Sequence, residues 1–238
     1  MDYQFHFKRR EQKYLLTVKQ TEQLMGWIVR FMRPDPWGAS TVRSLYFDTP
    51  SYQLIRDSIS RPVYKEKLRL RSYSAVSGSN TVFLELKKKY QSVVYKRRTA
   101  LVFDVAMECL LNGRPFPEKN QITDEISYFL KLYTPLAPSV LLSYDRQAYY
   151  DRECSEFRLT LDRNIRFELH AASLSTLPSR PFLLPDGKIL MEIKSAQGMP
   201  LWLADFLCRQ GLYKTSYSKY GAIYASEIFS KERNYRYA

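Results

Sequence analysis

Glycine, cysteine and histidine are scarce in this sequence of 238 residues, with 8, 3 and 2 copies respectively. The few glycines form no Gly-rich phosphate loop, which argues against a P-loop NTPase. Cys109, Cys154 and Cys208 stand far apart without metal-ligand spacing, and we interpret them as reduced thiols of a cytoplasmic protein. With only His6 and His170, a histidine metal site and His-dependent nucleophilic catalysis are both poorly supported.

Long apolar runs are missing as well. No stretch approaches the ~18 apolar residues that a membrane span needs, and we do not expect the first residues, Met1 to Gln4, to be a signal peptide. We find no internal repeat, linker or low-complexity tract, and therefore expect one domain over residues 1–238. Hydrophobic residues at 45% and charged residues at 26% exclude global disorder.

Positive charge is the property that the chain has in excess. Lys and Arg outnumber Asp and Glu by 37 to 24, which gives a net charge of +13 and a pI near 9.6. Such a balance implies an anionic partner, whether nucleic acid, an anionic membrane surface or a phosphorylated small molecule.

The stretch Lys-Leu-Arg-Leu-Arg at residues 67–71 shows how this charge is arranged. On a strand, Lys67, Arg69 and Arg71 would share one face and the two leucines the other. Taken alone, the pattern is typical of a half-buried strand whose basic face is wet. Three cations on one face nevertheless repel one another and call for an anion between them.

The same alternation recurs along the chain between helical patterns. We expect strands at residues 7–16, 41–48, 65–73, 81–90, 92–103, 139–149, 156–162, 165–169 and 188–195. A loop is expected at residues 35–38, and Arg163-Asn164 is expected to join two strands. We expect helices at residues 18–32 (capped by Thr17), in a short segment from Thr49-Pro50, and at 104–112, 123–133, 200–210 and 218–229.

At least six of these strands carry paired, mostly basic charges at i, i+2 spacing. If such a sheet curls with its charged face inward, the result is an α+β fold: an antiparallel β-barrel tunnel with a charged lumen and helices packed on the outside. Two like charges ~4 Å apart repel by about 4 kcal/mol at an effective dielectric of ~20. A highly charged ligand such as a chain of phosphates would offset that repulsion.

Three acidic residues interrupt the basic faces. Glu11, Glu85 and Glu192 each precede a lysine by two residues on the same expected face. One interpretation is a same-face ion pair worth a fraction of a kcal/mol. The other, which the three instances together favour, is that these carboxylates coordinate Mg²⁺ or Mn²⁺ beside substrate phosphates.

A set of short motifs then appears in a particular order. They are Arg9-x-Glu11-x-Lys13-Tyr14, Ser44-Leu45-Tyr46-Phe47-Asp48, Lys67-x-Arg69-x-Arg71, Glu85-x-Lys87, Lys96-Arg97, Tyr144-x-Arg146, Arg158-Leu159-Thr160-x-Asp162, Glu192-x-Lys194 and Ser218-Lys219-Tyr220. This ordered set, from about residue 7 to 225, resembles the VTC-type polyphosphate polymerase domain of the triphosphate tunnel metalloenzymes. No single motif is specific, but the ordered set is.

The resemblance implies an antiparallel tunnel that binds ATP and inorganic polyphosphate and moves the γ-phosphate of ATP onto the chain end with a divalent metal, Mn²⁺ or Mg²⁺. By position, the residues expected to bind phosphates are Lys13, Arg69, Arg71, Lys87, Lys96, Arg146, Arg158, Lys194 and Lys219. Glu192 would hold the metal, assisted by Tyr144 and Ser218, and Arg9 and Lys67 complete the expected substrate contacts. One further basic position is either Arg56 or Arg61.

One departure bears on the type of reaction. Triphosphatase members of the wider superfamily begin with Glu-x-Glu-x-Lys, whereas the first position here is Arg9. The missing carboxylate leaves fewer metal ligands and no obvious pair to activate water, which favours transfer to phosphate over hydrolysis. A tunnel triphosphatase or cyclase is the first alternative.

A non-catalytic polyphosphate binder or a nucleic-acid-binding protein is the second alternative. The 19 Tyr and 13 Phe residues could stack on bases, but they stand mostly at core-like positions and no single-strand-binding motif appears. We therefore do not expect nucleic acid to be the partner. The direction of the reaction in the cell, a membrane-protein partner and the oligomeric state stay open.

Overall fold

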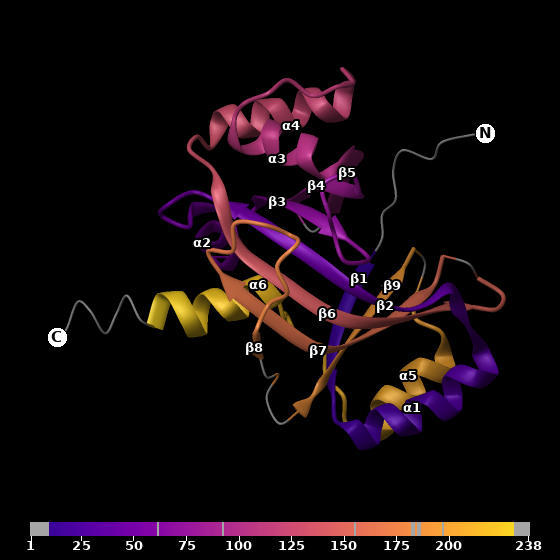
Figure 1. The fold of residues 1–238 in the computed structure, drawn as a ribbon. Helices are drawn as coiled ribbons and strands as arrows, with labels where there is room; N and C mark the ends of the chain where they lie inside the picture. Colours follow the sequence, from indigo (N-terminus) through magenta and orange to yellow (C-terminus); the bar gives the residue numbers. More distant parts are fainter. Residues whose placement is uncertain are drawn as a thin grey trace. The chain divides into compact units, whose positions relative to one another are not determined.

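The computed structural model describes residues 10–60, 62–91, 93–154, 156–181, 184, 187–196 and 198–230. Within them, nine strands form one sheet in the order β1-β9-β7-β6-β2-β3-β4-β5, with β8 paired to β7 (Figure 1). The strands are β1 (Arg10–Leu16), β2 (Met32–Asp48), β3 (Tyr64–Ser72), β4 (Thr81–Tyr90), β5 (Val93–Val102), β6 (Ala137–Asp151), β7 (Arg158–Leu169), β8 (Arg180–Pro181) and β9 (Ile189–Ser195).

The helices complete an α+β fold, as expected. They are α1 (Val18–Phe31), α2 (Gln53–Ile59), α3 (Phe103–Leu111), α4 (Gln121–Leu132), α5 (Leu201–Arg209), α6 (Lys219–Ile223) and the π-helix η2 (Tyr224–Phe229). In the part of the chain that the structure describes, no helix is long and apolar enough to cross a membrane.

The sheet is antiparallel, as predicted, but the barrel is only approximate. The pairs β1–β9, β7–β9, β2–β3, β3–β4 and β4–β5 all run antiparallel. The strand order begins at β1 and ends at β5, whereas a closed barrel would also pair these two strands. Among the described residues the sheet is therefore an open path.

The chain divides into two compact units, each with its own hydrophobic core, and strands β2, β6 and β7 pass from one to the other. Unit 1 comprises Met1–Thr41, Tyr144–Ile165 and Pro181–Tyr217, and unit 2 comprises Val42–Ser143, Arg166–Arg180 and Ser218–Ala238. The prediction of one domain over residues 1–238 stays a prediction.

Unit 1 is built on strands β1, β9 and part of β7, with α1 and α5 lying side by side (Figure 1). Thr17 and Gln20 form the capping box that begins α1, as the sequence predicted for Thr17. Leu24 and Ile28 recur at helical spacing and are buried in the core of this unit. Phe31 of α1 stacks on Trp202 of α5 with ring centroids 5.0 Å apart.

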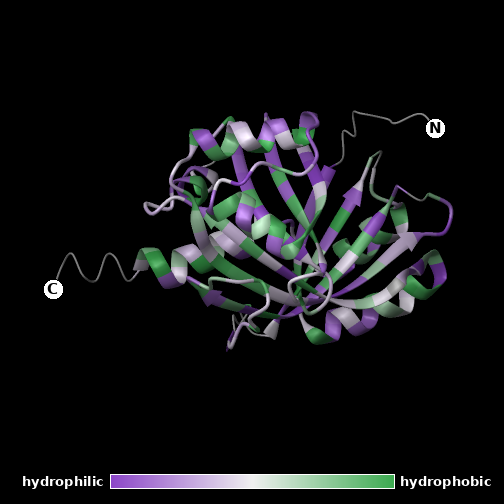
Figure 2. Cartoon of the chain, turned by 45° about the horizontal axis from the view of Figure 1, so that its top comes forward, coloured by the Kyte–Doolittle hydropathy of each residue, from purple (hydrophilic) through white to green (hydrophobic). Residues whose placement is uncertain are grey.

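Unit 2 is built on the β2-β3-β4-β5 ladder. Leu68 and Leu70 of β3 lie opposite Leu86 and Leu84 of β4, and all four are fully buried. Helices α3 and α4 pack over β4 and β5 (Figure 1). Figure 2 shows the alternation that produces this arrangement, as purple and green bands along the strands.

Asp48 determines where the short helix α2 begins. Its Oδ1 accepts a hydrogen bond from the Leu54 amide at 2.9 Å, and its Oδ2 accepts one from the Ile55 amide at 3.0 Å. The helix therefore begins at Gln53 instead of at the predicted Thr49-Pro50. A buried carboxylate next to the first amides satisfies donors that a helix leaves unpaired.

Three expectations about elements are wrong in detail. The predicted loop at residues 35–38 belongs to strand β2, because prolines are tolerated near the start of a strand, where the ladder does not need their missing N–H. The predicted turn at Arg163-Asn164 is part of strand β7, in which Asn164 adopts a φ of 49° without ending the strand. The predicted last helix divides into α6 and the π-helix η2 at Tyr224.

Candidate functional site

In unit 2, one buried carboxylate lies among four cations. Glu85 of β4 is 1% exposed, and its Oε2 lies 2.8 Å from Arg69 Nη2 and 3.8 Å from Arg71 Nε. Its Oε1 lies 2.6 Å from Lys96 Nζ and 3.6 Å from Arg98 Nε. We call these residues, together with Tyr46, the Glu85 cluster.

Strand register assembles the Glu85 cluster. Arg69 of β3 and Arg98 of β5 are the direct cross-strand partners of Glu85, one on each side. Residues opposite one another in an antiparallel pair project to the same face, so all three side chains meet there. Arg98 also lies over the Phe83 ring, with Cζ 3.5 Å from the ring centroid.

The cations keep Glu85 ionised. Burial alone would raise the pKa of this carboxyl, but Arg69, Arg71 and Lys96 outweigh burial and hold the pKa well below its usual range. The pKa of Lys96 is in turn lowered, mainly by burial, and Arg69 and Arg71 add to that lowering against the effect of Glu85. The four cations thus share one carboxylate.

Tyr46 of β2 extends the cluster by one strand. Its hydroxyl accepts a hydrogen bond from Arg69 Nη1 at 2.9 Å, and its ring lies 4.9 Å from that of Tyr220. Burial would raise the pKa of the Tyr46 phenol, but Arg69, Arg71 and Lys67 outweigh it and lower the pKa to about 8. Ser44, the cross-strand partner of Arg71, accepts a hydrogen bond from Arg71 Nε at 3.3 Å.

Next to the Glu85 cluster lies a row of lysines. Lys67, Lys87 and Lys96 are successive cross-strand partners on β3, β4 and β5. Lys67 Nζ donates to the hydroxyl of Ser218, the residue that caps α6, at 3.4 Å. Lys219 is the first residue of that helix and is half-buried.

In unit 1, a second buried carboxylate lies among predicted site residues. Glu192 of β9 is 7% exposed; its Oε1 lies 3.4 Å from Lys13 Nζ, and its Oε2 lies 3.3 Å from Arg146 Nη2. Glu11 also approaches Lys13 Nζ at 3.4 Å, and Asp162 binds Arg146 through two hydrogen bonds of 2.7 and 2.8 Å. These five residues form the Glu192 cluster.

Both cations of the Glu192 cluster stay charged. Burial would lower the pKa of Lys13, but Glu192 and Glu11 outweigh burial and raise it well above its usual value. The pKa of Arg146 is likewise raised against burial, by Tyr144, Asp162 and Glu192. Tyr144 is buried, and Arg146 Cζ lies 5.2 Å from the centroid of its ring.

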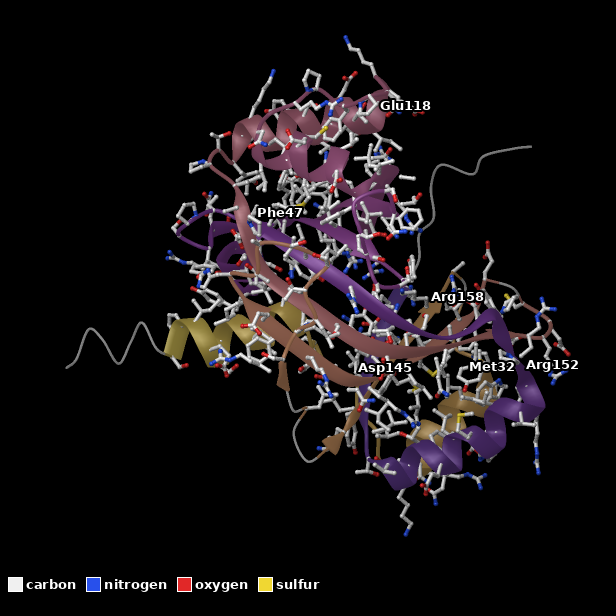
Figure 3. The ribbon with its side chains drawn as sticks, in the orientation of Figure 1. Met32, Phe47, Glu118, Asp145, Arg152 and Arg158 are labelled. Carbon is white, nitrogen blue, oxygen red and sulfur yellow. The ribbon has the colours of Figure 1, made fainter. Side chains whose placement is uncertain are left out.

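Arg158 and Lys194 lie beside this cluster. They are cross-strand partners on β7 and β9, and Lys194 Nζ is 4.0 Å from Glu192 Oε2. Arg158, labelled in Figure 3, pairs with Asp35 at 3.2 Å and lies 4.3 Å from the centroid of the Tyr150 ring. Its side chain is 35% exposed, so it is accessible without being on an open surface.

The donor set for a metal is small. Nowhere in the described ranges do three or more His, Cys, Asp or Glu side chains gather closely enough to hold an ion. Glu11 and Glu192 nevertheless flank one cation, Lys13, and carboxylate oxygens are the ligands that Mg²⁺ and Mn²⁺ prefer. Because Mg²⁺ is usually bound by one or two carboxylates plus substrate phosphates, these residues fit a metal that arrives with its substrate.

Arg98 and Tyr46 were not among the site residues predicted from the sequence. Arg98 stands two residues after Lys96 on the same strand face, and Tyr46 belongs to the motif at residues 44–48, so a signal was present for both. Of the unassigned basic positions, Arg56 is exposed on α2. Arg9 and Arg61 lie outside the described residues.

The model of the VTC domain matches residues 8–228 of the chain. The chain belongs to the VTC domain family. No curated protein sequence matches it.

Several solved structures are similar to this VTC domain to different degrees. A protein described as a "putative adenylate cyclase" from Bacillus halodurans has 15% sequence identity and a TM-score of 0.54, with 89% of this chain and 96% of that chain covered. The PH1819 protein from Pyrococcus horikoshii OT3 has 13% identity and a TM-score of 0.48, with coverages of 92% and 99%. A Mimivirus capping enzyme triphosphatase has 8% identity and a TM-score of 0.36, with coverages of 84% and 88%.

The first of these similarities establishes the fold, and the family match covers nearly the whole chain. Together they identify a VTC domain with a fold that a solved structure shares. Both carboxylate clusters lie within the matched residues.

Proposed function

We propose that this VTC domain is a polyphosphate-synthesising phosphotransferase that moves the γ-phosphoryl group of ATP onto a growing polyphosphate chain. The observation that carries the proposal is the Glu85 cluster, in which four cations share one buried carboxylate. Cations held at that density are stabilised further by an added polyanion, and a chain of phosphates supplies one negative charge after another.

The cations of the cluster suit phosphate in particular. The arginine fork donates two parallel hydrogen bonds to phosphate oxygens, whereas lysine acts as a point charge. Arg69 and Arg71 supply such forks, and the row of Lys67, Lys87 and Lys96 supplies point charges beside them. In unit 1, we propose that Lys13, Arg146, Arg158 and Lys194 also bind phosphates, and in unit 2 that Ser218 and Lys219 do so.

The transfer step needs little from the protein beyond position and charge. A terminal oxygen of the polyphosphate attacks the γ-phosphorus of ATP, the bond from that phosphorus to the bridging oxygen breaks, and ADP leaves with the electron pair. Charge develops on the equatorial and leaving oxygens, where fixed cations stabilise it. No base is required, since a phosphate oxygen at the chain end is already ionised.

Glu192, together with Glu11, would hold Mn²⁺ or Mg²⁺ in this proposal. When bound, the metal would neutralise charge on the phosphates and help to orient them. Glu192 would be the main ligand because it is buried and lies within reach of two proposed phosphate ligands, Lys13 and Arg146. Glu85 was also a predicted metal ligand. Because four cations surround it, we propose instead that it is their counter-ion, and the Glu85→Gln variant described in the Discussion tests this role.

The experiment is to incubate the purified protein with ATP and Mn²⁺ and to follow several products together. Polyphosphate on a stained gel, with ADP as co-product, supports the proposal. Free phosphate released from tripolyphosphate would indicate a tunnel triphosphatase, and cyclic AMP with pyrophosphate would indicate a cyclase. If the protein bound tripolyphosphate but formed none of these products, it would be a non-catalytic polyphosphate-binding protein, and the proposed activity would be wrong.

A thermal shift tests the binding half of the proposal separately. A ligand that binds only the folded state at 100 times its Kd stabilises that state by about 2.7 kcal/mol. Millimolar tripolyphosphate should therefore raise the Tm by several degrees. An unchanged Tm would contradict a phosphate-binding tunnel.

A further inference from the structure

Thr160 of β7 carries a buried hydroxyl that the contacts described so far do not use. The residue is 4% exposed, and its Oγ1 has no hydrogen-bond partner among the residues that the structure describes. A buried hydroxyl without a partner costs free energy, and native proteins rarely keep one without a reason.

The register places Thr160 directly opposite Glu192. Thr160 and Glu192 are direct cross-strand partners on β7 and β9. Side chains that are directly opposite in an antiparallel pair project to the same face, with Cβ atoms about 4.5–5.5 Å apart. The hydroxyl is therefore within reach of the Glu192 carboxylate after a small rotation of either side chain.

In the structure, cations rather than Thr160 hold Glu192. Lys13 approaches one carboxylate oxygen at 3.4 Å, and Arg146 approaches the other at 3.3 Å. Both cations are proposed phosphate ligands. When phosphate oxygens bind Lys13 and Arg146, these cations interact less strongly with Glu192. The Glu192 carboxylate then needs another hydrogen-bond donor to keep its orientation.

We propose that Thr160 is a positioning residue for Glu192, whose hydroxyl donates a hydrogen bond to the Glu192 carboxylate when phosphate engages Lys13 and Arg146. The inference rests on the proposed function, since it assigns Glu192 to the metal that accompanies the substrate. Carboxylates that bind metals are themselves held by hydrogen bonds, and loss of such a bond typically weakens metal affinity or activity by about 10–100-fold.

The test compares Thr160→Val, which removes the hydroxyl at nearly constant shape, with Thr160→Ser, which keeps it. Mn²⁺ binding is measured by electron paramagnetic resonance in the presence of tripolyphosphate, tripolyphosphate binding by calorimetry in a chelator, and the Tm without ligand. For Thr160→Val we expect Mn²⁺ affinity about 10–100-fold weaker, unchanged tripolyphosphate affinity, and a Tm equal to or above that of the wild type. Thr160→Ser should retain the wild-type Mn²⁺ affinity.

The sign of the Tm change separates this role from a structural one. If the hydroxyl served only the folded structure, Thr160→Val would lower the Tm and leave Mn²⁺ affinity unchanged. That result overturns the inference, as does equal Mn²⁺ binding by wild type and Thr160→Val. Should the valine variant fail to fold, Thr160→Ala against Thr160→Ser makes the same comparison.

Failure of the proposed function would look different. If the wild type bound neither tripolyphosphate nor Mn²⁺ in its presence, the phosphate site itself would be refuted, and the inference with it. If the wild type bound both and Thr160→Val behaved identically, only the role of Thr160 would be lost.

Discussion

Arg69 and Glu85 face each other across the β3–β4 ladder, and Nε and Nη2 of the arginine each lie 2.8 Å from the same carboxylate oxygen, Oε2. A basic face such as that of Lys67, Arg69 and Arg71 needs an anion among its cations, and in this molecule Glu85 is such an anion. The site therefore carries part of its counter-charge internally, which limits the repulsion before substrate binds.

Replacing Glu85 by glutamine should destabilise the free protein and strengthen phosphate binding. Removing one partner of a buried ion pair typically costs about 3–5 kcal/mol, because the remaining charges lose their compensation. Tripolyphosphate would supply that compensation, so the ligand-induced rise in Tm should exceed that of the wild type. Denaturant unfolding with and without tripolyphosphate, in a chelator, measures both effects.

Glu66→Gln is the matched control for Glu85→Gln. Glu66 is also buried and also on a strand of unit 2, but it pairs with Lys88 and Tyr133, on the other side of β3 from Lys67. The Glu66→Gln substitution should lower the stability of the protein without strengthening tripolyphosphate binding. If Glu85→Gln instead weakened binding only when Mn²⁺ was present, Glu85 would be a metal ligand and not a counter-ion.

Arg71→Ala should weaken tripolyphosphate binding by about 10–100-fold, since a hydrogen bond to a charged group contributes about 1.5–3 kcal/mol. Arg97→Ala serves as the control, because Arg97 pairs with Glu125 of α4 rather than with Glu85. Calorimetric titration at constant salt compares the two variants. Equal affinities for Arg71→Ala and the wild type would remove Arg71 from the phosphate site.

Glu192→Gln should separate metal dependence from phosphate binding. It keeps the size of the side chain but removes the charge that a hard divalent cation needs, so Mn²⁺-dependent turnover should fall by orders of magnitude. Tripolyphosphate binding in a chelator should persist or tighten. As a control, Asp205→Asn breaks the exposed Asp205–Arg209 pair on α5 and should change neither turnover nor tripolyphosphate binding. If the rate of Glu192→Gln were unchanged, Glu192 would simply be an ion-pair partner of Lys194.

Phosphate binding should weaken as the pH rises through about 8, where Tyr46 ionises. Above this pH the folded protein holds the phenol as the anion, because Arg69, Arg71 and Lys67 outweigh the opposing effect of burial on its pKa. A tyrosinate would compete with phosphate for Arg69. Tripolyphosphate affinity should be lower above this pH than below it. In Tyr46→Phe, the part of this decrease that comes from ionisation of Tyr46 should be absent.

Stability should change in the opposite direction over the same pH range. The pKa of Tyr46 is lowered in the folded state relative to about 10 in the unfolded chain, so between these values the unfolded state binds more protons. The contribution of Tyr46 to stability should therefore grow as the pH rises above about 8 and be complete above about 10. Tyrosinate absorbance measures the ionisation of Tyr46, and denaturant unfolding of the wild type and Tyr46→Phe measures its contribution to stability at each pH. A contribution that fell between about pH 8 and 10 would contradict the prediction.

Local pattern was enough to predict much of the fold. The alternation at residues 67–71 identified strand β3 and its charged face, and the spacing of Leu24 and Ile28 identified α1 with its Thr17 cap. These features depend on the period of a strand or a helix, which neighbouring residues determine. Where local signals disagreed with the structure, as in the predicted loop at residues 35–38 and at Asn164, pairing in the sheet prevailed over the preference of single residues.

The partner of each charge was decided only by the tertiary structure. Glu-x-Lys spacing suggested that Glu85 would pair with Lys87, yet register places Glu85 between Arg69 and Arg98, which are 16 positions before it and 13 after it in the sequence. Register depends on turns and on core packing across strands, and a slip of one residue would move every side chain to the other face. The sequence by itself therefore determined which residues share a charged face, whereas the fold decided which carboxylate stands among which cations and placed Thr160 opposite Glu192.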